Sequence, residues 1–280
     1  MRLQRIALLS AVGLALTACS SDTGPTVTDL PAAASVRYIE AVPDTNKTDL
    51  KFVDQIKGSP YFGQLAFRDI SAYEPVAPGA RHIRIFAVDP AIDANTSNEA
   101  NINVVSQVFV DTTITFEANK FYTIIHVGYA RTGSSPKQHL VVLTDDQSAV
   151  PSSSQIAVRV INTAPTLASA DVYNGTSASG AALFTGVAFG TSSAYKLLST
   201  GTVTFTATAS GSSTVAATAA APAGAPPATV SQSALGGYSI GGSMLTAFIF
   251  PASVKGSLAA SNTATSVKWM QDNFPQTPGA

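Results

Sequence analysis

The chain has 280 residues, of which 45% are hydrophobic and only 12% are charged, and its formal net charge is −1. The balanced charge argues against nucleic acid as a partner, and the apolar content excludes a charge-rich disordered chain. Cys19 is the only cysteine, which excludes an internal disulfide framework.

Residues 1–18 have the order of a bacterial secretory signal. Arg2 and Arg5 precede an apolar stretch at 6–16 that is too short to span a bilayer as a permanent helix. The ending Leu16-Thr17-Ala18-Cys19 resembles the lipobox of bacterial lipoproteins, which implies cleavage before Cys19 and acylation of its thiol. An ordinary signal with a chance cysteine near its end is the open alternative.

Residues 19–34 are expected to be the acylated cysteine and a flexible tether, because they are small, polar and Pro-containing. Ser20 after the cysteine favours, by resemblance to known sorting rules, release to the outer membrane. We therefore expect a cell-envelope protein whose membrane partner is held through the lipid, with the periplasmic or surface face left open.

The remaining chain repeats itself. A shift of 122 positions gives 13 identities over positions 36–79, against about three expected by chance. The matches include Arg37 with Arg159 and Asp49 with Asp171. The sequence thus predicts a first domain at 35–148, a linker at 149–155, a second domain at 156–254 and a C-terminal tail at 255–280.

The local pattern predicts strands and almost no helix. Short segments rich in Val, Ile, Phe, Tyr and Thr are bounded by Pro, Gly, Asn or Asp. The nearly unbroken apolar segment 120–128 predicts a central strand covered on both faces. Six to eight short strands per copy predict an all-β fold of two tandem immunoglobulin-like antiparallel β-sandwich domains. The predicted strands are 35–42, 49–53, 81–88, 103–110, 120–128 and 138–144, then 156–161, 170–173, 201–209, 229–233 and 244–250.

A family resemblance rests on Leu65-Ala66-Phe67, Tyr73, Pro78-Gly79 and Tyr122-Thr123, with Val187-Ala188-Phe189-Gly190 and Tyr195 in the second copy. This order resembles the domain of unknown function (DUF) 4397 family. The resemblance implies an exported or lipoprotein-type β-sandwich and no established activity. The second copy departs from the pattern after Gly201, where the Tyr-Thr pair becomes Leu245-Thr246.

The repeated charges predict structural ion pairs. Between Pro151 and Val254 the only charged residues are Arg159, Asp171 and Lys196. Two of them stand where the first copy has Arg37 and Asp49, so we predict Arg37–Asp49 and Arg159–Asp171 salt bridges between the first two strands of each copy. Independent edge charges are the alternative.

Other repeated residues are expected to be structural. We place Phe67, Phe189, Tyr73 and Tyr195 in the core, with a ligand-stacking surface as the alternative. Gly79 and Gly201 are expected in turn conformations that other residues avoid. In the tail, 267–270 forms either a closing strand or a segment that exposes Trp269 to a sugar or protein.

The sequence predicts no catalytic residue, metal or cofactor. His82, His126 and His139 form no zinc motif, and His126 is expected in the core. Asp93, Asn95 and Ser97 have calcium-loop spacing without the required Gly and Glu, so 89–99 is interpreted as a polar loop.

These observations predict a non-catalytic, lipid-anchored envelope protein with a structural or binding role toward an unidentified envelope protein or glycan. A carbohydrate-binding or adhesive module would instead expose a row of aromatics. An envelope hydrolase would use the first domain only and gather Asp44, Asp49, Asp54 or His126 in one pocket. An assembly accessory would accept a partner strand at an open sheet edge.

Overall fold

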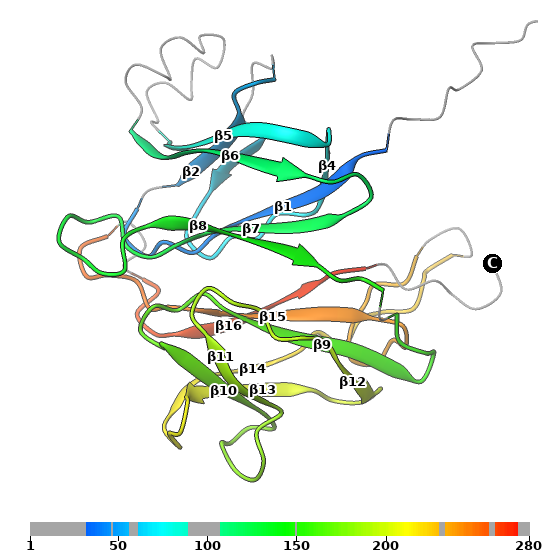
Figure 1. The fold of residues 1–280 in the computed structure, drawn as a ribbon. Coiled ribbons are helices and arrows are strands. Elements are labelled where there is room, and N and C mark those ends of the chain that lie inside the picture. Colours follow the sequence, from blue (N-terminus) through cyan, green and yellow to red (C-terminus); the bar gives the residue numbers. More distant parts are fainter. Residues whose placement is uncertain are drawn as a thin grey trace, which may run out of the picture. The chain divides into compact units, whose positions relative to one another are not determined.

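A computed structural model describes residues 32–45, 47–55, 61–88, 107–148, 150–229, 233–257 and 261–273. Every regular element in these ranges is a β-strand, which confirms the all-β class predicted from the sequence (Figure 1). Accordingly, no helix of these residues has the length and apolar character needed to cross a membrane.

The first half forms a sandwich of two four-stranded sheets. The outer sheet has the order β3-β2-β5-β6 and the inner sheet the order β4-β1-β7-β8. Side chains from both sheets, such as Tyr38, Leu50, Ile85 and Ile124, fill the core between them. The strands are β1 Ala34–Glu40, β2 Thr48–Phe52, β3 Phe62–Leu65, β4 Glu74–Val76, β5 Gly79–Ala87, β6 Val108–Phe116, β7 Phe121–Val127 and β8 His139–Asp145.

The second half repeats this topology. Its outer sheet has the order β11-β10-β13-β14 and its inner sheet the order β12-β9-β15-β16. The register is repeated too, since Arg37 lies opposite Thr123 as Arg159 lies opposite Thr246. The duplication found in the sequence is therefore a duplication of fold. The strands are β9 Gln155–Asn162, β10 Ser169–Asn174, β11 Phe184–Ala188, β12 Lys196–Ser199, β13 Thr204–Ala209, β14 Val215–Ala220, β15 Met244–Phe250 and β16 Ser266–Gln271.

One pair of strands in each sandwich differs from the antiparallel expectation. β1 and β7 are parallel, as are β9 and β15, while the other paired strands are antiparallel. In the first sandwich, β7 is not joined to β1 by a hairpin. The chain crosses from β6 in the outer sheet to β7 in the inner sheet, where β7 runs in the same direction as β1.

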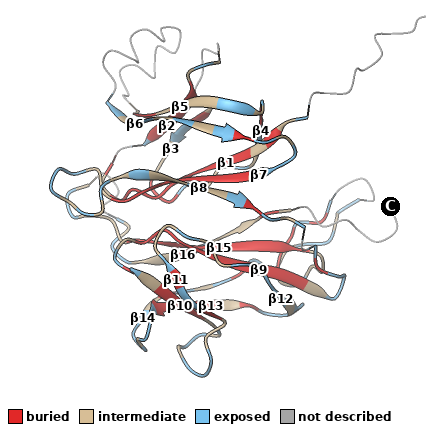
Figure 2. Cartoon of the chain, in the orientation of Figure 1, coloured by how far each residue is buried: buried red, intermediate tan, exposed pale blue. Residues whose placement is uncertain are grey.

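The two inner sheets pack face to face, so the four sheets are stacked in sequence (Figure 1). An apolar cluster joins Ile39 and Ile125 of the first sandwich to Ile161, Phe248 and Phe250 of the second. Strands β1, β7, β9 and β15 are consequently buried on both faces (Figure 2). This packing explains why segment 120–128 is apolar almost throughout, because its second face is covered by the other copy.

The C-terminal tail contributes β16, which pairs antiparallel with β15 and completes the second inner sheet. The ring centroid of Trp269 lies 4.6 Å from that of Phe205, and its Nε1 donates to the carbonyl of Ala219 at 3.3 Å. Trp269 therefore packs against the second core, which corresponds to the closing strand considered for this segment.

Candidate functional site

Two ion pairs cross the interface between the inner sheets. Nη1 of Arg37 lies 2.7 Å from Oδ1 of Asp272, and both side chains are fully buried. Nη2 of Arg159 lies 2.7 Å from Oδ1 of Asp145, without the angles of a hydrogen bond. Each arginine thus meets the aspartate of the other sandwich.

Each aspartate is held by residues of its own sandwich. Oδ2 of Asp145 accepts hydrogen bonds from Thr123 at 2.5 Å and from Tyr73 at 2.8 Å. The same threonine accepts from Nε of Arg37 at 2.8 Å. The result is a continuous chain of polar contacts from the arginine to the aspartate in one sandwich.

The second sandwich repeats this arrangement. Oδ2 of Asp272 accepts from Thr246 at 2.6 Å and from Tyr195 at 2.8 Å, and Nε of Arg159 donates to Thr246 at 2.7 Å. We call these eight residues the reciprocal network. They are Arg37, Tyr73, Thr123 and Asp145, with Arg159, Tyr195, Thr246 and Asp272.

The electrostatics of the reciprocal network favour the charged form of its arginines. Burial alone would lower the pKa of Arg37, but Asp272, Tyr73 and Asp145 together outweigh that effect and leave the pKa raised. Burial raises the pKa of Tyr73 and of Tyr195, so both phenols stay protonated and donate to the carboxylates. The guanidinium carbons of Arg37 and Arg159 each lie 4.7 Å from the centroid of the tyrosine ring in their own sandwich.

The predicted Arg37–Asp49 and Arg159–Asp171 salt bridges are wrong. The arginines lie on the face of each inner sheet that meets the other sandwich, whereas β2 and β10 belong to the outer sheets across the core. Oδ1 of Asp49 accepts from the backbone N–H of Gln64 at 2.6 Å.

Asp171 has the equivalent turn-holding role in the second sandwich. It accepts from the backbone N–H groups of Gly186 at 2.7 Å and Gly211 at 3.0 Å, and from Ser210 Oγ at 2.9 Å. Burial alone would raise the pKa of Asp171, but these hydrogen bonds outweigh it and leave the pKa lowered. The repeated aspartates therefore organise turns of the outer sheets.

A third contact between the sandwiches comes from Arg68, whose φ is 75°. Its guanidinium donates to the carbonyl of Pro251 at 2.5 Å and also to that of Ala264. Gly190 stands at the equivalent position of the second copy with a φ of 74°. A backbone conformation that suits glycine is thus accepted by an arginine whose side chain joins the two halves.

A buried polar cluster occurs in the first sandwich. Nδ1 of His126 lies 2.9 Å from Oε2 of Glu40, and both side chains are fully buried. The same oxygen accepts from Tyr38 at 2.8 Å and from Thr48 at 2.7 Å. Nε2 of the same histidine lies 3.1 Å from Oε1 of Gln138, so both ring nitrogens have polar partners and His126 is a satisfied core residue as expected.

The equivalent position in the second sandwich explains this cluster. Asn162 stands where the first copy has Glu40, and its Oδ1 accepts from the backbone N–H of Ala164 at 3.0 Å. Oε1 of Glu40 makes the same contact with Val42 at 2.8 Å. Both residues hold the turn that follows the strand, and the second carboxyl oxygen of the glutamate also contacts Nδ1 of His126.

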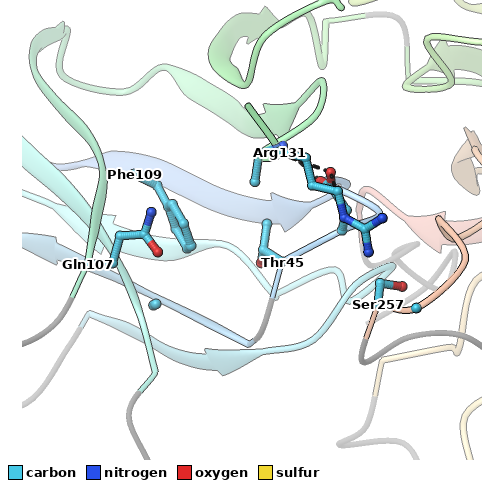
Figure 3. Close-up of a pocket in the computed structure, with 9 residues that line it drawn as sticks. Thr45, Gln107, Phe109, Arg131 and Ser257 are labelled. Atoms are coloured by element: carbon cyan, nitrogen blue, oxygen red, sulfur yellow. Dashed lines mark hydrogen bonds and ion pairs between the residues drawn. The ribbon is translucent and has the colours of Figure 1, made fainter. Parts of the chain in front are cut away.

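A pocket of about 350 Å³ lies beyond the end of β1, and Figure 3 shows its lining. It is lined by Asp44, Thr45, Ala87, Gln107, Phe109, Ala130, Arg131, Gly256 and Ser257. The ring centroid of Phe109 lies 6.0 Å from that of His126, so the phenylalanine separates the pocket from the buried histidine.

A groove of about 530 Å³ runs beside the second ion pair and is lined by Val142–Thr144, Asp146, Arg159 and Thr191–Tyr195. Its hydroxyls serve the local backbone: Thr191 donates to Ala188, Ser192 to Ser193, and Ser193 to Ala194. Arg159 is engaged with Asp145, so the groove offers few free polar groups.

The remaining candidates are dispersed. Asp54 pairs with Arg81 at 3.0 Å, and His82 contacts Asp111 on the exposed face of the outer sheet. Asp44 lines the pocket beyond β1, whereas Asp49, Asp54 and His126 do not. The four residues considered for a hydrolase site are therefore not gathered in that pocket. Among the described residues, no group of three or more His, Cys, Asp or Glu side chains is arranged to hold a metal ion.

The repeated aromatic and glycine positions are also located. Phe67 is buried and Phe189 packs against the cluster between the sandwiches. Gly79 and Gly201 have φ angles of 104° and 150°, which fit the turn conformation expected of them. The predicted signal, Cys19 and the polar loop 89–99 lie outside the described residues. The predicted tether does so as well, except for its last residues, 32–34.

A comparison with protein families matches residues 34–173 to the family described as “Domain of unknown function (DUF4397)”. The match runs from the start of β1 into β10, so it spans the first sandwich and the first two strands of the second. No curated protein matches the chain.

Proposed function

The chain belongs to the DUF4397 family, and from that premise we propose that it is a lipid-anchored cell-envelope protein without catalytic activity. Its two sandwiches act as a single rigid body that performs a structural or binding role. The reciprocal network carries this proposal, because it uses buried ionisable groups to fix one domain on the other.

The envelope address rests on the N-terminal sequence. Arg2 and Arg5 precede the apolar stretch at 6–16, and Cys19 stands at the end of the lipobox-like run. Each buried methylene of an acyl chain adds about 0.8 kcal/mol of membrane affinity, so several chains anchor a protein without a membrane-spanning helix. Ser20 favours the outer membrane as the destination.

The proposal that the protein is not catalytic is supported by the burial and the contacts of its ionisable residues. Asp145 and Asp272 neutralise arginines, Asp171 holds turns, and Glu40 is matched by His126. These groups are buried and engaged, whereas a hydrolase would direct such groups into a cleft where a substrate can reach them.

The two binding alternatives find different support. The large apolar side chains most exposed in the described part of the chain are aliphatic, namely Val108, Val142, Val150, Leu197, Val215 and Leu235. A flat aromatic surface for glycans has no support there. Recognition in a pocket has more support, because the cavity beyond β1 joins an aromatic wall to polar groups.

Metabolic labelling tests the anchor. Cells that express the wild type should incorporate radiolabelled palmitate into the protein and retain it in the membrane fraction, whereas Cys19→Ala should lose both. Ser21→Ala is the matched control and should behave as the wild type. Label in Cys19→Ala, or no label in the wild type, would refute the lipid anchor.

Affinity capture tests the binding role. The acylated protein, cross-linked in its own envelope, should retain a defined protein or glycan that mass spectrometry identifies. Hydrolysis of envelope polymers by the purified protein would refute the proposal of a role without catalysis.

A further inference from the structure

We propose that the pocket beyond β1 binds an acidic sugar, meaning a monosaccharide-sized ring that carries a carboxylate. This inference names the ligand of the binding role proposed above, and it rests on that proposal. The pocket has a volume of about 350 Å³, within the lower range of small-molecule sites.

The charge of the ligand follows from Arg131 and Asp44. Asp44 is the only acid in the lining and its side chain is fully buried, with its two oxygens accepting from the backbone N–H groups of Ala130 at 2.8 Å and Arg131 at 3.1 Å. Nε of Arg131 stays 4.0 Å from that carboxylate, and 43% of the arginine side chain is exposed. The guanidinium fork therefore keeps its donors for an anion, and a carboxylate matches its geometry in a bidentate way.

The remaining polar groups favour hydroxyls on the ligand. Ser257 Oγ is buried and has no hydrogen-bond partner among the described residues. Gln107 is exposed at the other side of the lining, and Figure 3 shows it beside Phe109. An amide both donates and accepts, so the exposed Gln107 can pair with a sugar hydroxyl.

The apolar part of the lining accommodates a ring. Phe109 is half-buried, and Ala87 and Ala130 add small apolar surfaces around the cavity. The face of a pyranose presents C–H groups that pack on an aromatic ring, while its hydroxyls point outward to polar partners. A phosphate ion would use the guanidinium alone and leave this wall uncovered.

The charged residues of the pocket have no equivalent in the second sandwich. β1 starts at Ala34, and Asp44 and Thr45 of the pocket lining follow its other end. The second copy lacks the chemistry, because Thr166 and Val254 stand at the positions equivalent to Asp44 and Arg131. The pair of an aspartate and an arginine is thus not repeated in the second copy.

Calorimetric titration of the full-length protein in detergent tests the assignment. D-glucuronate should bind saturably, and neutral D-glucose and the ring carboxylate benzoate should each bind more weakly. Arg131→Gln should weaken glucuronate binding by at least about tenfold, the loss expected for a charge-assisted pair. Arg84→Gln, which removes a half-exposed arginine of the outer sheet, is the matched control and should leave binding unchanged.

A second variant guards against an effect on folding. Phe109→Leu keeps an apolar wall but removes the aromatic face, and it should weaken glucuronate binding while the circular dichroism spectrum stays that of the wild type. No saturable glucuronate binding, unchanged binding in Arg131→Gln, or benzoate binding as tight as glucuronate would overturn the acidic-sugar assignment. None of these results affects palmitate labelling or the capture of another partner, so the two proposals fail separately.

Discussion

Arg37 and Asp272 lie 235 positions apart in the chain, yet their side chains meet at 2.7 Å inside the molecule with no exposure to solvent. The Arg159–Asp145 pair repeats the contact in the opposite sense. Such exchange, in which each half gives its arginine to the other's aspartate, is the geometry of a two-fold symmetric dimer interface. The duplication has placed that interface within one chain.

Removing one partner of the first pair should destabilise the fold strongly. Asp272→Ala leaves Arg37 buried without its counter-ion and also deprives Tyr195 and Thr246 of their acceptor. We expect the free energy of unfolding in urea to fall by about 3–5 kcal/mol. Asp145→Ala should produce a loss of similar size, since its surroundings are equivalent.

Asp111→Ala is the control for that experiment. Its carboxylate also binds an arginine, at 2.7 Å, but 45% of the aspartate side chain is exposed. We expect a loss of at most about 1 kcal/mol. If Asp272→Ala cost no more than the control, the buried pair would not hold the sandwiches together.

The sequence singles out the arginines and tyrosines of this network but not the aspartates that they contact. Arg37, Arg159, Tyr73 and Tyr195 all emerged from the shift of 122 positions. Asp145 and Asp272 are separated by 127 positions, because loop lengths differ after the first strands, and the tail was assigned outside the second domain. Asp49 and Asp171 share the arginines' shift, so the sequence pattern pairs these aspartates with the arginines.

The fold itself was largely predictable, and one signal pointed to the interface. Alternation and turn residues give strands and a sandwich in each copy. Segments 120–128 and 244–250 are apolar on both faces, which indicates sheets covered on both sides. Which face meets the other copy depends on packing between distant strands, and a buried ion pair across that interface cannot be deduced from spacing alone.

The pH dependence of stability should reveal Asp171. Its lowered pKa means that the ionised carboxylate stabilises the fold above the ordinary value of 3.8, and that this stabilisation is lost as the pH falls through the lower value of the folded state. At pH 7 we expect Asp171→Asn to reduce the free energy of unfolding by about 1–2 kcal/mol, the loss of charged hydrogen bonds.

Repeating the urea unfolding at successively lower pH provides the decisive comparison. The difference between wild type and Asp171→Asn should shrink as the pH falls below 3.8. Asp54→Asn, which removes a half-exposed partner of Arg81, serves as the control and should change stability little at pH 7. A difference that persists unchanged at low pH would mean that the charge of Asp171 contributes nothing.

The first sandwich can be tested by giving it the residues of the second. Glu40→Asn removes the acceptor of His126, Tyr38 and Thr48, and His126→Ile leaves the buried glutamate without its histidine partner. Each substitution alone should lower the free energy of unfolding by about 3 kcal/mol or more. Together they recreate the Asn162–Ile249 pair found opposite one another in the second copy.

The double variant should therefore lose less stability than the sum of the two single variants, by about 1–3 kcal/mol. This coupling arises because neither residue of the double variant leaves the other's buried polar group without a partner. Glu40→Asn combined with Asp111→Ala supplies the control, since Asp111 lies exposed on the outer sheet and the two losses should add. Additive losses for Glu40→Asn and His126→Ile would show that the glutamate and histidine do not depend on each other.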